Sequence, residues 1–179
     1  MIGVLVSGEG TNLQALIDAG LPITAVASNN TKARALDRAV AAGIEAAAFP
    51  AVEFGSREER DLAMADFLEE RGVRWVVCAG YMHLLSKPFL DRFPGRIVNT
   101  HSAPLPEFPG ARPIEDVLAA GVPETAATVH YVDEGVDTGQ VIAAERVPVL
   151  PDDTAESLRA RVQAVEHKLL PRVVRELVQ

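Results

Sequence analysis

The stretch Ile2-Gly3-Val4-Leu5-Val6-Ser7-Gly8-Glu9-Gly10-Thr11-Asn12 predicts a buried strand, a glycine-rich turn and the start of a helix. Residues 2–6 are apolar throughout, which is typical of a strand covered on both faces of its sheet. Glycines let backbone amides approach a ligand closely, and the amino-terminal end of a helix favours an anion. We expect either a phosphate cradle formed by Gly10, Thr11 and Asn12, or a tight turn that only starts the helix.

Two common nucleotide-binding motifs are excluded at this turn. Leu13 stands where a dinucleotide-binding fingerprint needs its third glycine, and Ser28-Asn29-Asn30, after the second strand, offers no acid to hold a ribose diol. No Gly-Lys-[Ser/Thr] follows either, which excludes a P-loop.

Outward from the turn, short apolar runs alternate with amphipathic stretches as far as residue 100. The predicted strands cover residues 2–6, 23–28, 46–49, 75–79 and 96–100, and the predicted helices cover 12–19, 33–42 and 56–71. Apolar strands that alternate with helices pair in parallel. The pattern therefore predicts an α/β fold, a single-domain doubly wound and mostly parallel sheet with helices on both faces.

The pattern changes after residue 100. A loop rich in proline and glycine precedes a helix predicted over 114–120, strands predicted over 126–131 and 140–147, and a long helix over 154–177. Ser56 with Glu59, and Asp153 with Glu156, have the spacing of capping boxes at two helix starts. We expect Pro171 to kink the last helix.

Composition limits the classes of function. The 179 residues carry a formal net charge of −8, which argues against non-specific nucleic-acid binding but leaves a local basic pocket for an anion open. Of these residues 48% are hydrophobic, as in a globular protein. Cys78 is the only cysteine, so a disulfide or a cysteine-based zinc cluster is excluded. The start of the chain is a poor signal peptide and no apolar run is long enough to span a membrane, so we expect a cytoplasmic protein.

A second polar segment, Asn99-Thr100-His101, follows an apolar strand. Asn99 and His101 are two residues apart, so their side chains point the same way if the strand continues through both. A hydrogen-bond donor beside a titratable ring is what catalysis at a carbonyl needs. Alternatively, the two residues only close the strand and satisfy a turn.

The remaining candidates are charged or histidine side chains. An acid in the loop 133–139 could orient His101 and favour its imidazolium, although solvated acids are commoner in such turns. Arg57 lies in the first turn of a predicted helix, where a cation opposes the helix dipole, and this hints at a ligand.

Two polar residues of the last helix and two further histidines are the remaining candidate site residues. Gln163 and Glu166 are three residues apart on the last helix and share a face, where such side chains are usually only solvated. His167 and His130 have no nameable partner and are predicted to be structural. No histidine pair has metal-ligand spacing such as His-x-x-x-His.

Taken together, these segments resemble the phosphoribosylglycinamide formyltransferase family, folate-dependent enzymes of purine synthesis. The resemblance covers nearly the whole chain, and the order and spacing of its motifs make it specific. The matching segments are residues 7–13, Ala79-Gly80-Tyr81-Met82, Asn99-x-His101, Val129-His130-Tyr131-Val132, Val136-Asp137-Thr138-Gly139-Gln140 and residues 161–167.

The resemblance implies a Rossmann-like formyltransferase fold and a role for each matching residue. The catalytic group would be Asn99, His101 and Asp137. The substrate phosphate would be held by Gly10, Thr11 and Asn12, and the substrate ribose approached by Gln163 and Glu166. The folate site would be lined by Arg57, Met82, His83, Leu84, Leu85 and the loop 133–137, which includes Asp133.

The implied reaction is formyl transfer from 10-formyltetrahydrofolate, a co-substrate, to the amine of glycinamide ribonucleotide, without a metal. Asn99 and a protonated His101 would stabilise the oxyanion of a tetrahedral intermediate, with Asp137 assisting. Residues 1–179 would form one domain, with a phosphate-binding half over about 1–100 and a folate and catalytic half over about 101–179. Its partners would be these two small molecules, with no nucleic acid or membrane, in a monomer or homodimer.

The chain departs from the family pattern at two places. His101-Ser102-Ala103-Pro104-Leu105-Pro106 stands where the family usually has His-Pro-Ser-Leu-Leu-Pro, and His83 stands where many relatives have arginine. Three alternative functions stay open. Two are enzymes with the same formyl-binding core: a formyltetrahydrofolate deformylase, which normally has an additional N-terminal domain, and a methionyl-tRNA formyltransferase, which normally has an additional RNA-binding domain. The third is a phosphate-binding module without catalysis.

Overall fold

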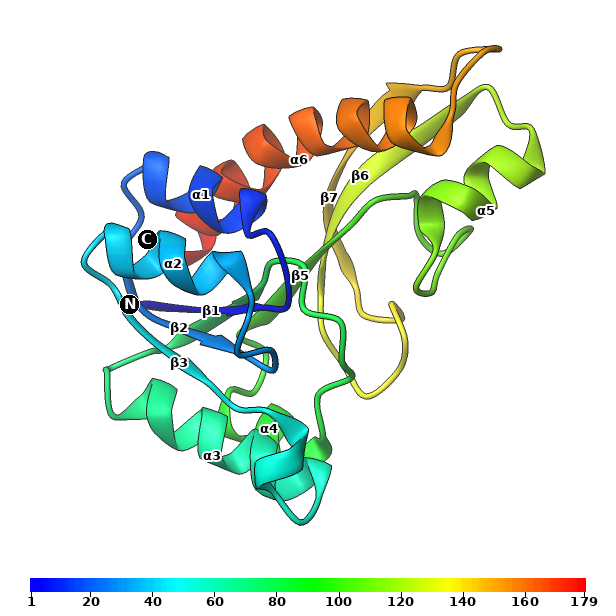
Figure 1. The fold of residues 1–179 in the computed structure, drawn as a ribbon. Helices are drawn as coiled ribbons and strands as arrows, with labels where there is room; N and C mark the ends of the chain where they lie inside the picture. Colours follow the sequence, from blue (N-terminus) through cyan, green and yellow to red (C-terminus); the bar gives the residue numbers. More distant parts are fainter.

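One seven-stranded sheet, with the order β3-β2-β1-β4-β5-β6-β7, organises the computed structural model, which describes residues 1–179 (Figure 1). The strands are β1 (Ile2–Val6), β2 (Ile23–Ser28), β3 (Glu45–Ala48), β4 (Trp75–Cys78), β5 (Ile97–His101), β6 (Glu124–Tyr131) and β7 (Val141–Pro148). Strands β1 to β5 pair in parallel, whereas β6 and β7 are antiparallel. The predicted fold class is confirmed.

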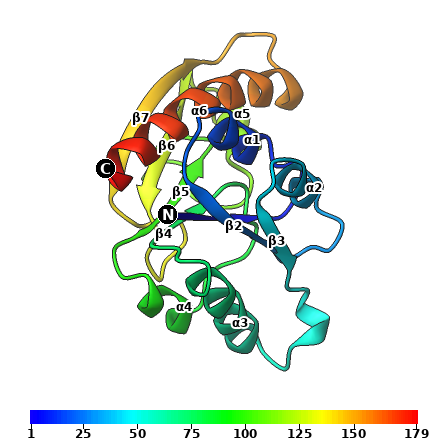
Figure 2. The same cartoon turned by 90° about the vertical axis from the view of Figure 1, so that its left-hand side faces the viewer.

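Helices cover both faces of this sheet. They are α1 (Thr11–Asp18), α2 (Arg34–Ala41), α3 (Arg57–Glu69), α4 (Lys87–Arg92), α5 (Pro113–Ala120), α6 (Ala155–Val178) and the short 3₁₀ helix η1 (Ala51–Glu53). Figure 2 shows α1, α2 and α6 on one side of the sheet and α3 and α4 on the other. No helix, α6 included, combines the length and the apolar character that crossing a membrane requires.

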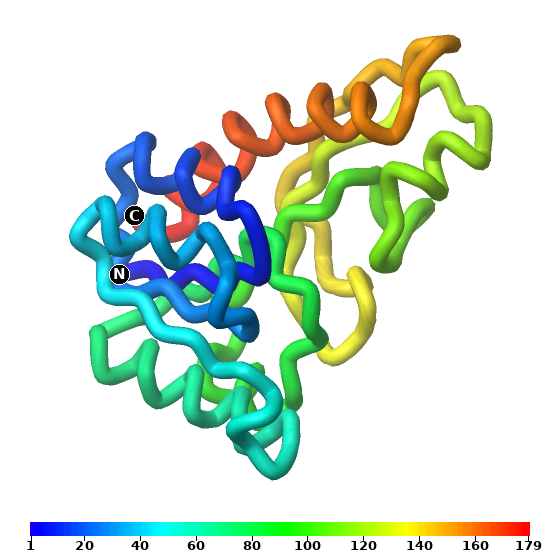
Figure 3. Tube along the Cα trace, in the orientation of Figure 1, coloured from blue at the N-terminus to red at the C-terminus, as the bar shows by residue number.

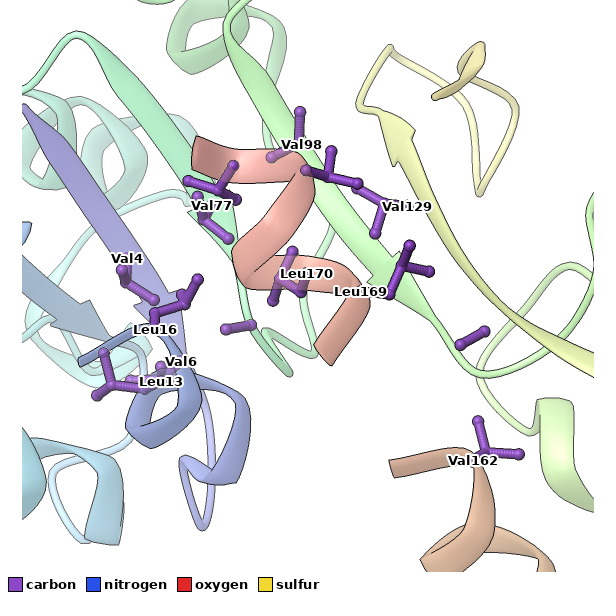
Figure 4. Close-up of a cluster of buried hydrophobic side chains, with 14 of the residues drawn as sticks. Val4, Val6, Leu13, Leu16, Val77, Val98, Val129, Val162, Leu169 and Leu170 are labelled. Carbon is purple, nitrogen blue, oxygen red and sulfur yellow. The ribbon is translucent and has the colours of Figure 1, made fainter. Parts of the chain in front are cut away.

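The alternation of side chains along β1 explains why both faces are buried. Val4 and Val6 pack in one cluster with α1, α2 and α6, whereas Leu5 packs in a second cluster with α3 and α4. Figure 4 shows part of the first cluster, in which Leu13 and Leu16 of α1 lie beside the two valines. The cluster continues along the sheet and α6 through Val77, Val98, Val129, Val162, Leu169 and Leu170. A strand buried on both faces has no polar alternation, as the sequence predicted.

The helix starts correct two expectations. Ser56 caps α3 by accepting from the Glu59 N–H at 3.1 Å, but the Glu59 carboxylate binds the Gly55 N–H at 2.9 Å instead of closing the box. Helix α6 begins with a box formed by Thr154 and Ser157, so the box predicted for Asp153 and Glu156 is wrong. Asp153 instead accepts from Arg161 at 2.7 Å, and this ion pair fixes it outside the helix.

Helix α6 runs from Ala155 to Val178 with Pro171 buried inside it, and the kink expected at this proline stays a prediction.

The strand order places a crevice in the middle of the sheet. From β1 the chain moves outward to β2 and β3, and it then returns to add β4 and β5 on the other side of β1. Ligands bind at such a switch point, outside the carboxyl ends of the strands. Figure 3 shows the segments that leave β1 and β4, together with the segment around residue 135, in the middle of the molecule.

Candidate active site

A cleft of about 760 Å³ opens at the carboxyl ends of β1, β4 and β5, and its size suits small-molecule substrates. We call it the central cleft. The predicted site residues that line it are Gly10, Thr11, Asn12, Met82, His83, Leu84, Leu85, Asn99, His101, Asp133, Asp137, Gln163 and Glu166. The central cleft thus draws on both halves of the chain.

Arg57 is the one predicted site residue that the structure does not bring to the central cleft. Its side chain is half exposed at the start of α3, and its ionic partner is the neighbouring Glu58 at 4.0 Å. A cation in the first turn is tolerated here because solvent and Glu58 screen it from the helix dipole.

Strand β5 aligns the two central polar side chains. It runs through His101, so Asn99 and His101 lie on the same face of the strand, as expected. The His101 Nε2 lies 2.6 Å from the Phe108 carbonyl oxygen, and a carbonyl only accepts, so Nε2 carries a hydrogen. Nδ1 faces Asp137 Oδ2 at 3.6 Å and is the nitrogen at which His101 can gain or lose a proton.

His130 joins this group, although the sequence analysis predicted a structural role for it. It lies directly opposite Asn99 in the β5–β6 ladder and is 2% exposed. Its Nδ1 donates to the Tyr131 carbonyl at 2.7 Å, so Nε2 of the neutral ring is an acceptor. The Asn99 amide donates to that Nε2 at 3.1 Å, which orients the amide and leaves its second N–H free.

Asp137 completes the cluster. Its carboxylate accepts from the Gly110 N–H at 2.9 Å and lies 3.5 Å from His130 Nε2. Burial by itself would raise the pKa of Asp137, but the two histidine rings beside it and the Gly110 N–H together lower that pKa below its ordinary value. Asp137 is also the only non-glycine residue with positive φ, at 54°, a conformation that aspartate tolerates.

The acidic loop is held in shape by contacts of its own. Asp133 Oδ1 accepts from the Gly135 N–H at 3.0 Å and from the Thr138 hydroxyl at 2.5 Å, so one oxygen of Asp133 holds the turn. Gly139 approaches β6 so closely that a Cβ there would lie 1.7 Å from the Tyr131 carbonyl oxygen. Glycine is therefore required at this position.

The turn after β1 leaves the backbone N–H groups at the start of α1 without a side-chain cap. Gly10 adopts φ 76° as the N-cap of α1, and a Cβ on it would lie 2.5 Å from the Ala35 Cβ of α2. Helix α1 has no side-chain cap and no acid in its first turn, so its first N–H groups remain available to an anion.

Glu166 is a buried carboxylate at the wall of the central cleft, with 3% of its surface exposed. Its two oxygens accept from Asn12 Nδ2 at 3.2 Å and from the Ser102 hydroxyl at 2.6 Å, and no cation lies within 4.0 Å of it. The Asn12 Oδ1 is buried without any partner. Unsatisfied acceptors of this kind call for donors from a ligand.

The segment after β4 offers an apolar surface. Met82 is 73% exposed and Leu84 is 49% exposed, both at the central cleft. The Met82 N–H donates to the Ser7 hydroxyl at 2.9 Å, which ties this segment to the turn after β1. The Ser86 N–H donates at 2.8 Å to Asp61, a fully buried carboxylate of α3.

Several charged groups in or near the central cleft were not predicted. Asp61 pairs with the buried Arg60 at 3.0 Å, beneath the segment 81–86. Burial, and then the Arg60 charge, hold the pKa of His83 below its ordinary value, so His83 is neutral at pH 7. Arg112 and Arg159 also line the central cleft, and Arg159 pairs with Glu115 at 2.9 Å.

Nothing in this arrangement resembles a metal centre, since no group of three or more His, Cys, Asp or Glu side chains could hold an ion together.

Comparison with known proteins gives a consistent set of relatives. The model of the formyl transferase family matches residues 1–174. The crystal structure of phosphoribosylglycinamide formyltransferase from Streptococcus pneumoniae superposes with a TM-score of 0.96 at 43% identity, over 99% of this chain and 98% of that one.

Curated sequences agree with the structural match. Phosphoribosylglycinamide formyltransferase from Haemophilus influenzae is 39% identical over 97% of this chain and 85% of its own length. The trifunctional purine biosynthetic protein adenosine-3 of Drosophila pseudoobscura pseudoobscura is 42% identical over 97% of this chain, which spans only 13% of that protein.

Proposed function

Because this chain belongs to the formyl transferase family, we propose that it transfers the formyl group of 10-formyltetrahydrofolate to the amine of glycinamide ribonucleotide, in de novo purine biosynthesis. The observation that carries the proposal is the cluster of Asn99, His101, His130 and Asp137 in the same cleft as an uncapped helix start. The names of relatives that align over most of their own length support the choice of substrate.

The phosphoribosyl part of the substrate fits the side of the central cleft that α1 and α6 form. The phosphate would accept from the N–H groups at the start of α1, around Gly10, Thr11 and Asn12. The ribose hydroxyls would donate to Glu166 and to the unpartnered Asn12 Oδ1, with Gln163 beside them on α6. A sugar phosphate has the anion that the N–H groups of α1 can bind and the hydroxyl donors that Glu166 and Asn12 Oδ1 can accept from.

The folate fits the opposite side, where exposed apolar groups surround the cleft. Met82, His83, Leu84 and Leu85 would contact the aromatic rings, and the loop 133–137, including Asp133, would close over them. The co-substrate supplies the formyl carbon that the amine attacks. We leave Arg57 out of this site because its side chain lies outside the central cleft.

Asn99 would stabilise the oxyanion that forms on the formyl group. The His130 ring already accepts one hydrogen of the Asn99 amide, so the other N–H can donate to the developing charge without reorienting. Loss of one such donor typically slows a reaction about a hundred- to a thousandfold.

His101 and Asp137 would carry out proton transfer beside the Asn99 amide. Asp137 stays ionised because its pKa is lowered, and its carboxylate lies 3.6 Å from Nδ1 of His101. Nδ1 of His101 would hold the proton that leaves the attacking amine, since Nε2 is engaged with the Phe108 carbonyl. Either Asp137 or a water molecule could pass the proton on to the folate nitrogen.

We further infer that the two small-molecule substrates are the partners of the protein, which needs no metal, nucleic acid or membrane. Residues 1–179 act as one domain, as a monomer or homodimer in the cytoplasm.

The proposal is tested by following the consumption of 10-formyltetrahydrofolate with and without glycinamide ribonucleotide. Consumption that depends on the ribonucleotide supports the proposal. Equal consumption in its absence would identify a deformylase, and ribonucleotide binding without turnover would identify a binding module. Both of these outcomes contradict formyl transfer.

A further inference from the structure

Ser102 occupies the position directly after the catalytic strand, at the point where β5 leaves the sheet. It is partly buried and lines the central cleft. Its hydroxyl makes a single hydrogen bond, to Glu166 Oε1 on α6 at 2.6 Å. The residue thus connects the exit of β5 with a helix that lies 64 residues away in the sequence.

Glu166 depends on this contact for its orientation. Its side chain has several rotatable bonds, and no cation lies within 4.0 Å to hold the buried carboxylate. Only two neutral donors fix it, the Asn12 amide at 3.2 Å and the Ser102 hydroxyl at 2.6 Å, one on each oxygen. The shorter bond is the one from Ser102, as expected for a hydroxyl that donates to a carboxylate.

We infer that Ser102 is a positioning residue for the phosphoribosyl substrate, which acts by aiming the Glu166 carboxylate at the sugar hydroxyls. The inference rests on the proposed function. With one lone pair of Oε1 held by Ser102, the remaining lone pairs of Glu166 point in fixed directions. The unpartnered Asn12 Oδ1 lies beside them, so the sugar meets two acceptors that are already in place.

This role separates Ser102 from the reaction step itself. The hydroxyl makes no hydrogen bond to Asn99, His101 or Asp137. Removal of the hydroxyl should therefore weaken the binding of one substrate without changing the chemistry at the formyl carbon. A hydrogen bond to a charged group corresponds to about a tenfold to a hundredfold change in an equilibrium constant.

The test compares Ser102→Ala with Ser102→Thr, which keeps a hydroxyl, and with Thr125→Val as a matched control. The Thr125 hydroxyl is buried in β6 without any partner, so its removal should change neither Michaelis constant. For Ser102→Ala we expect the KM for glycinamide ribonucleotide to rise about tenfold or more. The KM for 10-formyltetrahydrofolate and kcat should stay within about threefold, and Ser102→Thr should recover most of the loss.

A double-mutant cycle with Glu166→Gln tests whether Ser102 acts through Glu166. If it does, adding Ser102→Ala to Glu166→Gln should raise the ribonucleotide KM by less than about twofold, because the oriented carboxylate is already gone. Full multiplication of the two effects would overturn the inference. An equal rise in both Michaelis constants, a fall in kcat alone, or no rescue by threonine would overturn it too.

The positioning role of Ser102 can be tested even if the proposed formyl transfer is not observed. If the unaltered protein transfers no formyl group, calorimetry with glycinamide ribonucleotide replaces the KM measurement. Binding that weakens about tenfold in Ser102→Ala supports the positioning role even then. Equal binding by both proteins, or no binding by the unaltered protein, overturns it.

Discussion

Replacing His130 with leucine should slow formyl transfer while leaving substrate binding nearly unchanged. The change removes the Nε2 acceptor that orients the Asn99 amide at 3.1 Å. The lost bond alone corresponds to about a twofold to tenfold effect, and complete loss of Asn99 as an oxyanion donor to about a hundred- to a thousandfold effect. Because the amide is loosened but still present, kcat should fall about tenfold to a hundredfold, with both Michaelis constants within about threefold.

The assay is steady-state formyl transfer, with two matched variants. His130→Gln keeps an acceptor near the position of Nε2 and should recover much of kcat. His167→Leu removes a histidine of α6 that does not line the central cleft, and it should leave kcat unchanged. A folded His130→Leu protein with kcat within about twofold of the unaltered enzyme would refute the reasoning.

The remaining predictions concern charge and burial. Asp61→Ala should lower the free energy of unfolding by about 3–5 kcal/mol in urea titration, since it strands the buried Arg60; a loss below about 1 kcal/mol would contradict the buried pair. His83→Arg should lower the KM for folates with acidic tails at pH 7, because the pKa of His83 lies below its ordinary value and the histidine is neutral there; an unchanged KM would place the tail elsewhere. Cys78 should resist alkylation until the protein unfolds, because burial raises the pKa of its thiol to about 12.

Strands were the part of the fold that the sequence predicted best. Strands β1, β2 and β4 are short apolar runs that polar or glycine residues follow closely, because both faces of the sheet are covered. The six-residue helix α4 and the three-residue helix η1 were not predicted. Elements this short leave no periodic pattern, and their existence depends on packing against α3.

Local pattern also identified Asn99 and His101, since two residues two apart on a strand share a face. It did not identify His130, which depends on the antiparallel register that sets it opposite Asn99. The Val-His-Tyr-Val run gives no sign of that register, because any strand of this length would look the same. Only the antiparallel pairing of β5 with β6 brings His130 to Asn99.

Burial was the other property that the helix pattern did not reveal. Glu166 was expected to be a solvated side chain on the evidence of its helix alone, yet it is 3% exposed because the exit of β5 covers it. Arg57 shows the reverse case, a suspected ligand contact that is half exposed. Asp153 was predicted as a cap, but its ion pair with Arg161, eight residues further along the chain, decides its place. Each outcome depends on a partner outside the local pattern or on solvent.

The central claim is that formyl transfer takes place at His101, beside Asn99 and Asp137. Single-turnover transfer from 10-formyltetrahydrofolate to glycinamide ribonucleotide, measured with His101→Ala, tests it most directly. We predict a fall of about a hundredfold or more in a variant whose circular dichroism and melting temperature match the unaltered protein. Near-normal turnover in that folded variant would contradict the account.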